Sequence, residues 1–314
     1  MVKHRGDDIC GVLLLDKETG SSSNQVLQRV KRLFNAKKAG HTGSLDPLAT
    51  GLLPCCFGKA TCLSEYFLSS DKRYEAVIRF GVNTDSHDVD GDVTQTRPVK
   101  FSADDFQNAM ASFLGEIEQI PPMVSALKHK GQPLYKLALK GKEIERKPRK
   151  MTVYSLTGEM LADRENHAQI NVHCSSGFYV RQLATDLGEL LGCGAHIVEL
   201  RRTSSKSIHI DDAITWTELE EKLDGLEGEE RKTKIESLLL PPEKLLEFLP
   251  RLDVNEVETD HLSHGRRIDI PEKFLGLNDN DHICVYYGEN KFLGIGQHNP
   301  LGKMKIRRLF DLKH

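Results

Sequence analysis

The sequence lacks a hydrophobic run long enough to cross a membrane. No apolar stretch approaches the ~20 residues that a spanning helix needs, and residues 1–8 do not have the pattern of a signal peptide. The sequence also has no C-x-x-C pair, which argues against structural zinc. Its seven cysteines are odd in number and follow no pattern: Cys10, Cys55, Cys56, Cys62, Cys174, Cys193 and Cys284. These features favour reduced thiols in the cytoplasm.

A glycine-rich phosphate loop and a metal-ligand cluster are also missing. Residues 86–92 imitate part of a calcium loop, but the first ligand would be Ser86. The twelfth position holds Arg97, where a bidentate acid is required. A polar hairpin loop is therefore a better interpretation of this segment than a metal site formed by His87, Asp88 and Asp90. We expect no cofactor and no metal.

The charge is near balance, with a formal net value of −3 over 314 residues, yet it is unevenly distributed. Residues 128–150 carry nine Lys or Arg against Glu143 and Glu145, a local charge of +7. Residues 217–248 carry ten acids against five bases. The basic segment favours a nucleic-acid backbone as partner, although a solvated lysine-rich loop explains it equally well.

Hydrophobic periodicity indicates mixed strands and helices without a regular βαβ alternation, which favours an α+β fold. We expect strands at 11–17, 74–80 and 170–174, and helices after Ser22 or Ser23, from Ser102 to Phe113, and at 180–190 with Val180, Leu183, Leu187 and Leu190 on one stripe. Residues 217–248 read as a helix followed by a linker. Short strands between Gly and Asn turns predict a small C-terminal β-barrel, at 268–270, 283–287, 292–295 and 306–309.

One carboxylate stands out, Asp46, within the turn-rich string Gly40-His41-Thr42-Gly43-Ser44-Leu45-Asp46-Pro47-Leu48-Ala49-Thr50-Gly51. A single Asp before Pro is usually a turn or a helix cap. The whole string, however, resembles the catalytic loop of the TruB family of tRNA pseudouridine synthases. Further segments match that family in order: 16–23, 70–75, 174–181, and 192–196 with 200–202. The family usually has Pro where this chain has Glu18.

The resemblance implies a mixed-sheet pseudouridine synthase catalytic domain at 1–248, with 128–150 as a basic RNA-binding insertion. It also implies a PUA-like RNA-binding barrel at 249–314, carried by 264–266 and 292–296. The implied protein is a stand-alone, cytoplasmic tRNA pseudouridine-55 synthase. It would act as a monomer on the T arm of tRNA, without an obligate protein partner or a cofactor.

The implied reaction needs one ionised carboxylate, for which the family match indicates Asp46. Burial would raise its pKa, so a cation must oppose this, and the resemblance assigns Arg181, which can pair in bidentate fashion. Without the match, Arg181 reads as a surface arginine. Whether Asp46 attacks C1′, attacks the base, or removes a sugar proton is left open.

The uracil must leave the RNA stack to react, and the protein must stack on it in return. By resemblance Tyr74 stacks on the base and assists loss of the C5 proton, although alone it reads as a packed strand tyrosine. His41 supports the rearranged RNA loop, although a satisfied turn residue is the usual alternative. Tyr179 and Leu200 line the uracil pocket, and Lys17 is structural or faces the RNA.

Three other functions remain in competition. A guide-RNA-dependent pseudouridine synthase shares the Asp loop but carries longer terminal extensions, so we expect it less. An RNA-binding or tRNA-folding protein whose catalysis is dispensable fits the same motifs. A hydrolase using His41 and Asp46 is disfavoured because the sequence lacks a nucleophile elbow and a zinc ligand set.

Overall fold

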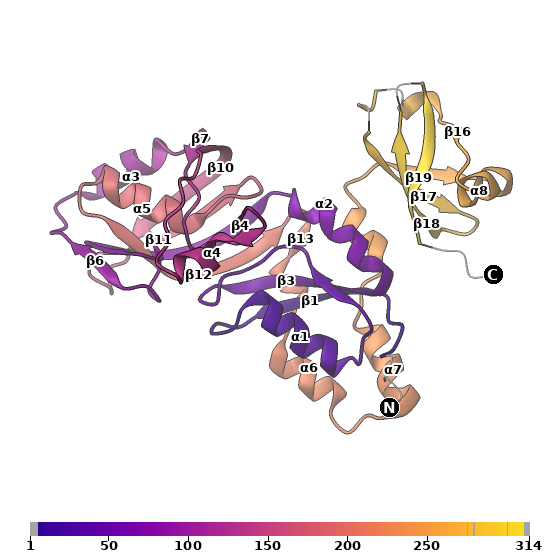
Figure 1. Cartoon of the computed structure of the whole chain (residues 1–314), viewed down its shortest axis with the longest axis horizontal. Coiled ribbons are helices and arrows are strands. Elements are labelled where there is room, and N and C mark those ends of the chain that lie inside the picture. Colours follow the sequence, from indigo (N-terminus) through magenta and orange to yellow (C-terminus); the bar gives the residue numbers. More distant parts are fainter. Residues whose placement is uncertain (1–5, 275, 279, 300, 311–314) are drawn as a thin grey trace.

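A large mixed sheet dominates the computed structural model, which describes residues 6–274, 276–278, 280–299 and 301–310 (Figure 1). Its strands are β1 (Gly11–Lys17), β2 (Ala39–His41), β3 (Thr50–Phe57), β4 (Lys72–Phe80), β7 (Gly115–Gln119), β10 (Arg149–Met160), β11 (His167–Cys174), β12 (Ala195–Ser205), β13 (Ile208–His209) and β14 (Ile214–Thr215). The order is β14-β1-β3-β12-β4-β11-β10-β7, with β2 beside β3 and β13 beside β12. The pairs β1–β14 and β3–β12 are parallel, whereas β4 pairs antiparallel with both neighbours. The predicted mixed α+β fold is confirmed.

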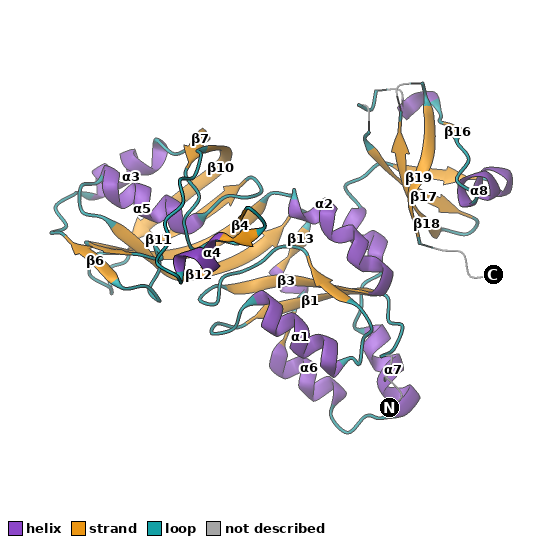
Figure 2. Ribbon diagram, viewed as in Figure 1, coloured by secondary structure: helices purple, strands orange, loops and turns teal. Residues whose placement is uncertain are grey.

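The α-helices are α1 (Ser23–Leu33), α2 (Ser64–Leu68), α3 (Ala103–Ala111), α4 (Leu134–Ala138), α5 (Val180–Leu190), α6 (Trp216–Leu223), α7 (Gly228–Ser237) and α8 (Glu256–Ser263) (Figure 2). Short 3₁₀ turns are η1 (Gly58–Leu63), η2 (Ile210–Asp212), η3 (Pro242–Leu246) and η4 (Glu272–Phe274). Ser22 and Ser102 cap α1 and α3 through reciprocal capping boxes with Gln25 and Asp105. None of the described helices is long and apolar enough to cross a membrane.

One face of the sheet is covered by helices. Residues of α1, α3, α5 and α6 pack with alternate residues of the strands in one continuous apolar core. Val30 of α1, Phe106 of α3 and Leu183 of α5 are each almost fully buried in it. Leu190 belongs to the predicted apolar stripe of α5 but is exposed, because the buried face of the helix ends at Leu187 and Gly188. That detail of the prediction is wrong.

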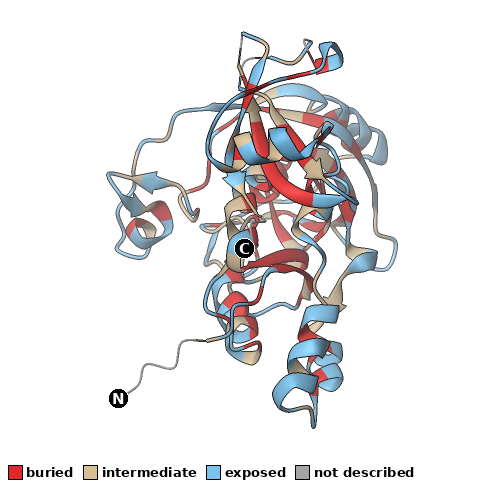
Figure 3. Cartoon of the chain, turned by 90° about the vertical axis from the view of Figure 1, so that its right-hand side faces the viewer, coloured by how far each residue is buried: buried red, intermediate tan, exposed pale blue. Residues whose placement is uncertain are grey.

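The opposite face of β1 and β3 carries a second core that reaches the C-terminal unit. Val12 and Leu52 point into it, together with residues of η1, α2 and η3. Cys284 and Ile295 from the C-terminal strands complete it. In Figure 3 the buried residues follow the strands of both sheets, while the outer faces of the helices are exposed. The C-terminal unit is therefore joined to the large sheet by a shared apolar core.

The C-terminal unit is a curled five-stranded sheet in the order β15-β17-β18-β19-β16. Its strands are β15 (Arg251–Val254), β16 (Ile268–Asp269), β17 (His282–Tyr287), β18 (Lys291–His298) and β19 (Lys303–Leu309). The sequence predicted four of these strands and missed β15, which pairs parallel to β17, and α8. The sheet forms a half-barrel, consistent with the predicted PUA-like unit. The boundary at 248/249 stays a prediction.

Two small hairpins project from the large sheet. The first joins β5 (Val82–Thr84) to β6 (Val93–Thr96), so the polar hairpin loop predicted at 86–92 is confirmed. The second joins β8 (Lys128–His129) to β9 (Gln132–Pro133) and leads into α4, within the basic segment. The acidic stretch predicted as helix and linker contains α6, α7 and η3.

Candidate active site

The loop that carries Asp46 is held rigidly from behind. Lys17, at the end of β1, is buried, and its ammonium donates to the carbonyls of Ala49 (2.6 Å), Glu18 (2.9 Å) and Pro47 (3.3 Å). Burial lowers the pKa of Lys17 to about 8. This placement favours the structural role over the RNA-facing one, because the ammonium is fully engaged by backbone carbonyls beneath the loop. A role of Lys17 in substrate binding stays a prediction.

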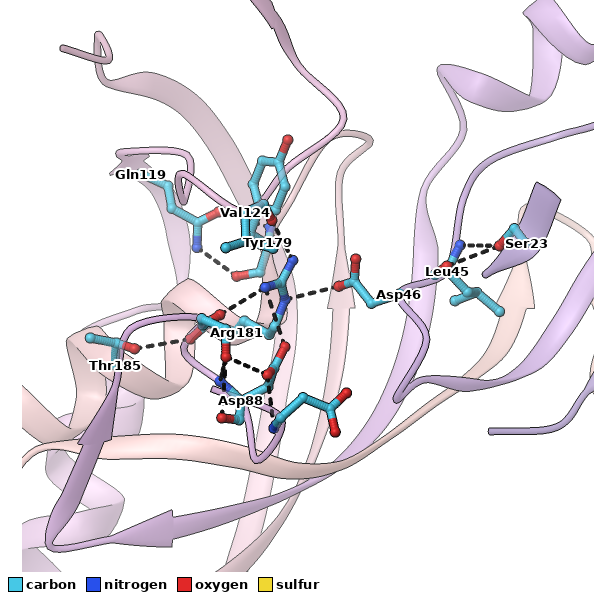
Figure 4. A network of polar contacts seen from close by, with 11 residues as sticks. Ser23, Leu45, Asp46, Asp88, Gln119, Val124, Tyr179, Arg181 and Thr185 are labelled. Carbon is cyan, nitrogen blue, oxygen red and sulfur yellow. Dashed lines mark hydrogen bonds and ion pairs between the residues drawn. The ribbon is translucent and has the colours of Figure 1, made fainter. Parts of the chain in front are cut away.

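A second tie comes from helix α1. The Ser23 hydroxyl accepts from the Leu45 amide (2.6 Å) and donates to the Leu45 carbonyl (3.0 Å), as Figure 4 shows. The Ala49 amide closes the turn by donating to the Asp46 carbonyl at 3.1 Å. A residue held at its neighbours on both sides has little freedom, so the Asp46 carboxylate is presented in one place.

Arg181 is the centre of the polar network. It lies in the first turn of α5 and is only 2% exposed. Its Nε lies 2.8 Å from Asp46 Oδ2, and its Nη1 lies 3.3 Å from Asp88 Oδ2 (Figure 4). The remaining donors reach the carbonyls of Ser86 (2.7 Å) and Val124 (2.8 Å). The predicted pair with Asp46 forms through Nε, and the guanidinium is shared with a second carboxylate.

Asp88 is a site residue that the sequence did not reveal. It is 5% exposed and accepts from the Ser86 hydroxyl (2.5 Å) and the Asp90 amide (3.2 Å). These bonds turn its other oxygen towards Arg181. Within the described residues no group of three or more His, Cys, Asp or Glu is arranged to hold a metal ion. The loop therefore supplies a carboxylate to the arginine.

Burial decides the electrostatics of Asp46. It raises the pKa of the carboxyl above its ordinary value, and Asp88 acts in the same direction, whereas Arg181 and Lys17 oppose it. The side chain is 41% exposed and lines a cavity. The carboxylate is thus bounded by protein and free on the side where a substrate would lie.

The cavity in front of Asp46 has a volume of about 340 Å³. Tyr74 of β4 and Leu200 of β12 line it, together with Phe178 and Tyr179, which precede α5. It also receives Leu45, Lys72, Ser125, Ala126 and Arg202. A small, open-mouthed cavity with aromatic walls and one carboxylate is suited to hold a single flat ring, which would itself displace water from the site.

Two aromatic residues of the cavity are fixed through their surroundings. Burial raises the pKa of Tyr74, so the phenol is neutral, and the Arg202 guanidinium acts against that shift. Arg202 is buried and donates to the carbonyls of Leu52 (2.8 Å) and Gly43 (3.2 Å). Tyr179 is held by Gln119, which donates to its carbonyl (3.0 Å) and accepts from its amide (2.8 Å). Arg202 lies in a matched motif but was not assigned a role from it.

His41 lies to one side of this arrangement. Its Nδ1 accepts from the Gly43 amide at 3.3 Å. Burial lowers the pKa of His41, as does Arg202, so the ring is neutral at pH 7. It is not among the residues that line the cavity. The structure therefore brings Asp46, Tyr74, Tyr179, Arg181 and Leu200 together, and leaves His41 and Lys17 as neighbours of the loop.

Comparisons with known proteins agree with this geometry. Residues 31–180 match the family model of the TruB family pseudouridylate synthase N-terminal domain, and residues 181–247 match the tRNA pseudouridylate synthase B C-terminal domain. The tRNA pseudouridine synthase B of Vibrio vulnificus (strain YJ016) is 42% identical over 310 residues, which covers 98% of this chain and 97% of that protein. That of Shewanella woodyi (strain ATCC 51908 / MS32) is 43% identical over 314 residues, covering 99% and 97%.

Solved structures show the same fold. A chain in the crystal structure of a Cbf5-Nop10-Gar1 complex superposes with a TM-score of 0.69 at 26% identity, covering 97% of this chain and 84% of that one. A chain of an H/ACA RNP bound to a substrate RNA containing 2′-deoxyuridine superposes with a TM-score of 0.69 at 24% identity, covering 96% and 85%. Together with relatives above 40% identity along nearly the whole length, this shows that the chain belongs to the TruB family of pseudouridylate synthases.

Proposed function

We propose that this protein isomerises uridine to pseudouridine at position 55, in the T loop of tRNA, with Asp46 as its catalytic carboxylate. The observation that carries the proposal is the pairing of Asp46 with buried Arg181 at the mouth of an aromatic-lined cavity. The relatives that match along the whole chain are named tRNA pseudouridine synthase B, which supports tRNA as the substrate.

The reaction exchanges one bond of the nucleoside for another. The bond between ribose C1′ and base N1 breaks, the base turns, and a bond forms between C1′ and C5. N1 takes up a proton, and the proton on C5 passes to solvent, so the atoms and charges balance. Ionised Asp46 supports the cleaved centre, by attack on C1′, by attack on the base, or by removing a sugar proton. Arg181 holds the carboxylate in position in each case.

The cavity offers the flipped base a stacking surface in place of the one it leaves in the RNA. Extruding a base costs a few kcal/mol of stacking, and the rings of Tyr74 and Tyr179 with the Leu200 side chain offer a replacement surface. Because Tyr74 is neutral, its phenolate is a minor species, so we assign it stacking ahead of removal of the C5 proton. The detached base and sugar are shielded from water by the same walls.

The RNA would be held on both sides of the cavity. The basic segment 128–150 contains the β8–β9 hairpin and α4. It begins two residues after Ala126, which lines the cavity. We assign this segment to the T arm and the C-terminal half-barrel to the acceptor end. We further propose a monomer in the cytoplasm without an obligate protein partner, which a sedimentation measurement of the protein with tRNA would test.

A guide-RNA-dependent activity is the second candidate, because the superposed chains come from a Cbf5-Nop10-Gar1 complex and from an H/ACA RNP bound to a substrate RNA, which are assemblies of several components. Sequence identity to the two groups of relatives distinguishes the two possibilities. The chain is 42–43% identical to relatives named tRNA pseudouridine synthase B, and 24–26% identical to the chains of those assemblies. The stand-alone tRNA enzyme is therefore favoured.

Tritium release from tRNA transcripts labelled at uracil C5 tests the proposal. We expect wild type to release about one equivalent per tRNA without added guide RNA, and Asp46→Asn to bind tRNA but release none. Asp90→Asn, which changes an exposed acid of the neighbouring loop, is the matched control and should retain release. Release by Asp46→Asn would remove Asp46 from catalysis. Binding without release by folded wild type would instead support an RNA-binding or tRNA-folding protein.

A further inference from the structure

Within the part of the chain that the structure describes, two guanidinium nitrogens of Arg146 have no hydrogen-bond partner. Its side chain is 21% exposed, yet its Nε and Nη1 are both buried and make no hydrogen bond. The nearest carboxylate oxygen, on Glu143, lies 3.9 Å from Nη1, and the Glu143 side chain is mostly in solvent. Guanidinium nitrogens that are withdrawn from water and form no hydrogen bond are unfavourable. Such a group is unusual unless a ligand completes it.

His87 provides a second unpartnered group in the same place. Its Nδ1 is buried and has no hydrogen-bond partner, and its backbone holds a left-handed conformation, with φ of 65°. Burial lowers the pKa of His87, and the charges of Arg181 and Arg146 lower it further. The chain contacts place the two segments together. The Ile144 amide donates to Met123 Sδ at 3.5 Å, and the carbonyl of the next residue, Val124, accepts from Arg181 at 2.8 Å. The part of the basic segment that carries Arg146 therefore lies beside the residues that Arg181 binds, as does the β5–β6 loop that carries His87.

The two residues adjoin the catalytic network without belonging to it. His87 is the residue next to Asp88, whose carboxylate contacts Arg181. Arg181 already faces two carboxylates and two carbonyls, so its donors are engaged. In Arg146, by contrast, the Nε and Nη1 donors form no hydrogen bond within the described residues. Planar guanidinium donors match the oxygens of a phosphate diester, which carries one negative charge.

We propose that Arg146, with His87 beside it, binds the backbone phosphate that flanks the flipped uridine. The proposal rests on the proposed function, because Arg181, next to these residues, lines the cavity that would receive the base. Fixing that phosphate orients the sugar against Asp46. It also draws the basic segment, which carries Arg146, against the β5–β6 loop once RNA is bound.

The test uses binding, so that it does not depend on turnover. A T-arm RNA hairpin is prepared unmodified and with an uncharged methylphosphonate at each phosphate next to the target uridine. We expect one such replacement to weaken binding by wild type about tenfold or more, the loss of one charge-assisted contact. Arg146→Gln should bind the unmodified RNA that much more weakly and should not respond to the replacement. For Arg146→Gln, the slope of log Kd against the logarithm of the salt concentration should decrease by about the contribution of one phosphate contact.

Lys147→Gln is the matched control, because Lys147 is an exposed neighbour in the same segment. It should remain sensitive to the methylphosphonate. His87→Phe, which removes both ring nitrogens, should weaken the unmodified RNA and leave the modified RNA unchanged. An unchanged melting temperature of each variant shows that it is folded.

The outcomes separate this inference from the proposed function. Equal sensitivity of Arg146→Gln and wild type to every replacement would overturn the phosphate site, even if wild type releases tritium. An equal loss by His87→Phe on both RNAs would remove His87 from it. Binding without tritium release would overturn the proposed function and leave the phosphate contact measurable.

Discussion

Replacing Asp88 by Asn tests how the second carboxylate acts on the first. Asp88 is buried, and its Oδ2 lies 3.3 Å from Nη1 of Arg181. Asn has nearly the same shape, so the substitution removes one negative charge and leaves the volume unchanged. The Asp46–Arg181 contact through Nε remains available. The variant therefore isolates the charge of Asp88.

Two effects follow from that loss. Asp88 is one of the causes that raise the pKa of Asp46, so this pKa falls in the variant. Because the reaction needs ionised Asp46, the acid side of the pH–rate profile moves to lower pH. At the neutral plateau, Arg181 has lost one charge-assisted partner, a difference of about 1.5–3 kcal/mol. If that energy serves to hold Asp46 in the transition state, the rate falls about tenfold to a hundredfold.

The assay is single-turnover tritium release from labelled tRNA, measured across the acid side and the plateau. Asp90→Asn is the control, because it removes an exposed charge from the same loop. Its profile should match that of wild type. An acid side that stays in place in Asp88→Asn, or moves to higher pH, would refute the electrostatic argument. An unchanged plateau would refute the positioning of Arg181 by Asp88.

Two further predictions concern the support of the site. Lys17→Met removes three bonds to the loop carbonyls, and we expect a slower single-turnover rate at unchanged tRNA affinity, measured by tritium release and filter binding. Burial lowers the pKa of Lys17 from 10.5 to about 8, so between these pH values the folded state binds fewer protons than the unfolded state. The free energy of unfolding of wild type, relative to that of Lys17→Met, should therefore rise from pH 8 to 10.5. A difference that shrinks over this range in urea titrations would contradict the assignment. Leu246→Ala leaves a cavity in the core that the C-terminal unit shares with the large sheet. We expect it to destabilise the protein by about 2–5 kcal/mol and to expose the segment 247–251 to proteolysis. An unchanged midpoint of urea unfolding would contradict the role of Leu246 in joining the two units.

Much of the fold could be predicted because its signals are local. The apolar run of β1 and the alternation in β4 are period patterns, and the Ser22 and Ser102 caps lie next to the helices they start. β15 escaped prediction because it is four residues long and acquires its strand character by pairing with β17, about thirty residues away. Its stability comes from a tertiary neighbour and not from its own sequence.

The residues of the candidate site also fall into those that local sequence indicates and those that only the fold reveals. Asp46, Tyr74, Tyr179, Arg181 and Leu200 were found through strings of neighbouring residues that resemble one family, and the structure brings them to one cavity; their individual roles stay predictions. Asp88 was missed because its own segment reads correctly as a polar hairpin. Only its contact with a helix more than ninety positions later gives it a function. The unpaired state of Arg146 is likewise invisible without the fold.

Arg181 joins three segments that are distant in the sequence. It contacts Asp46 in the loop before β3, Ser86 and Asp88 in the β5–β6 loop, and Val124 at the start of the segment that leads to the basic hairpin. Because one guanidinium satisfies all three, a shift of the Val124 carbonyl must change the donors left for the two carboxylates. Closure of the basic segment on RNA through Arg146 would therefore be felt at Asp46 through Arg181. A displacement of the Val124 carbonyl by bound RNA would thus reach the Asp46 carboxylate through a single guanidinium, whose contacts to both are formed in the structure.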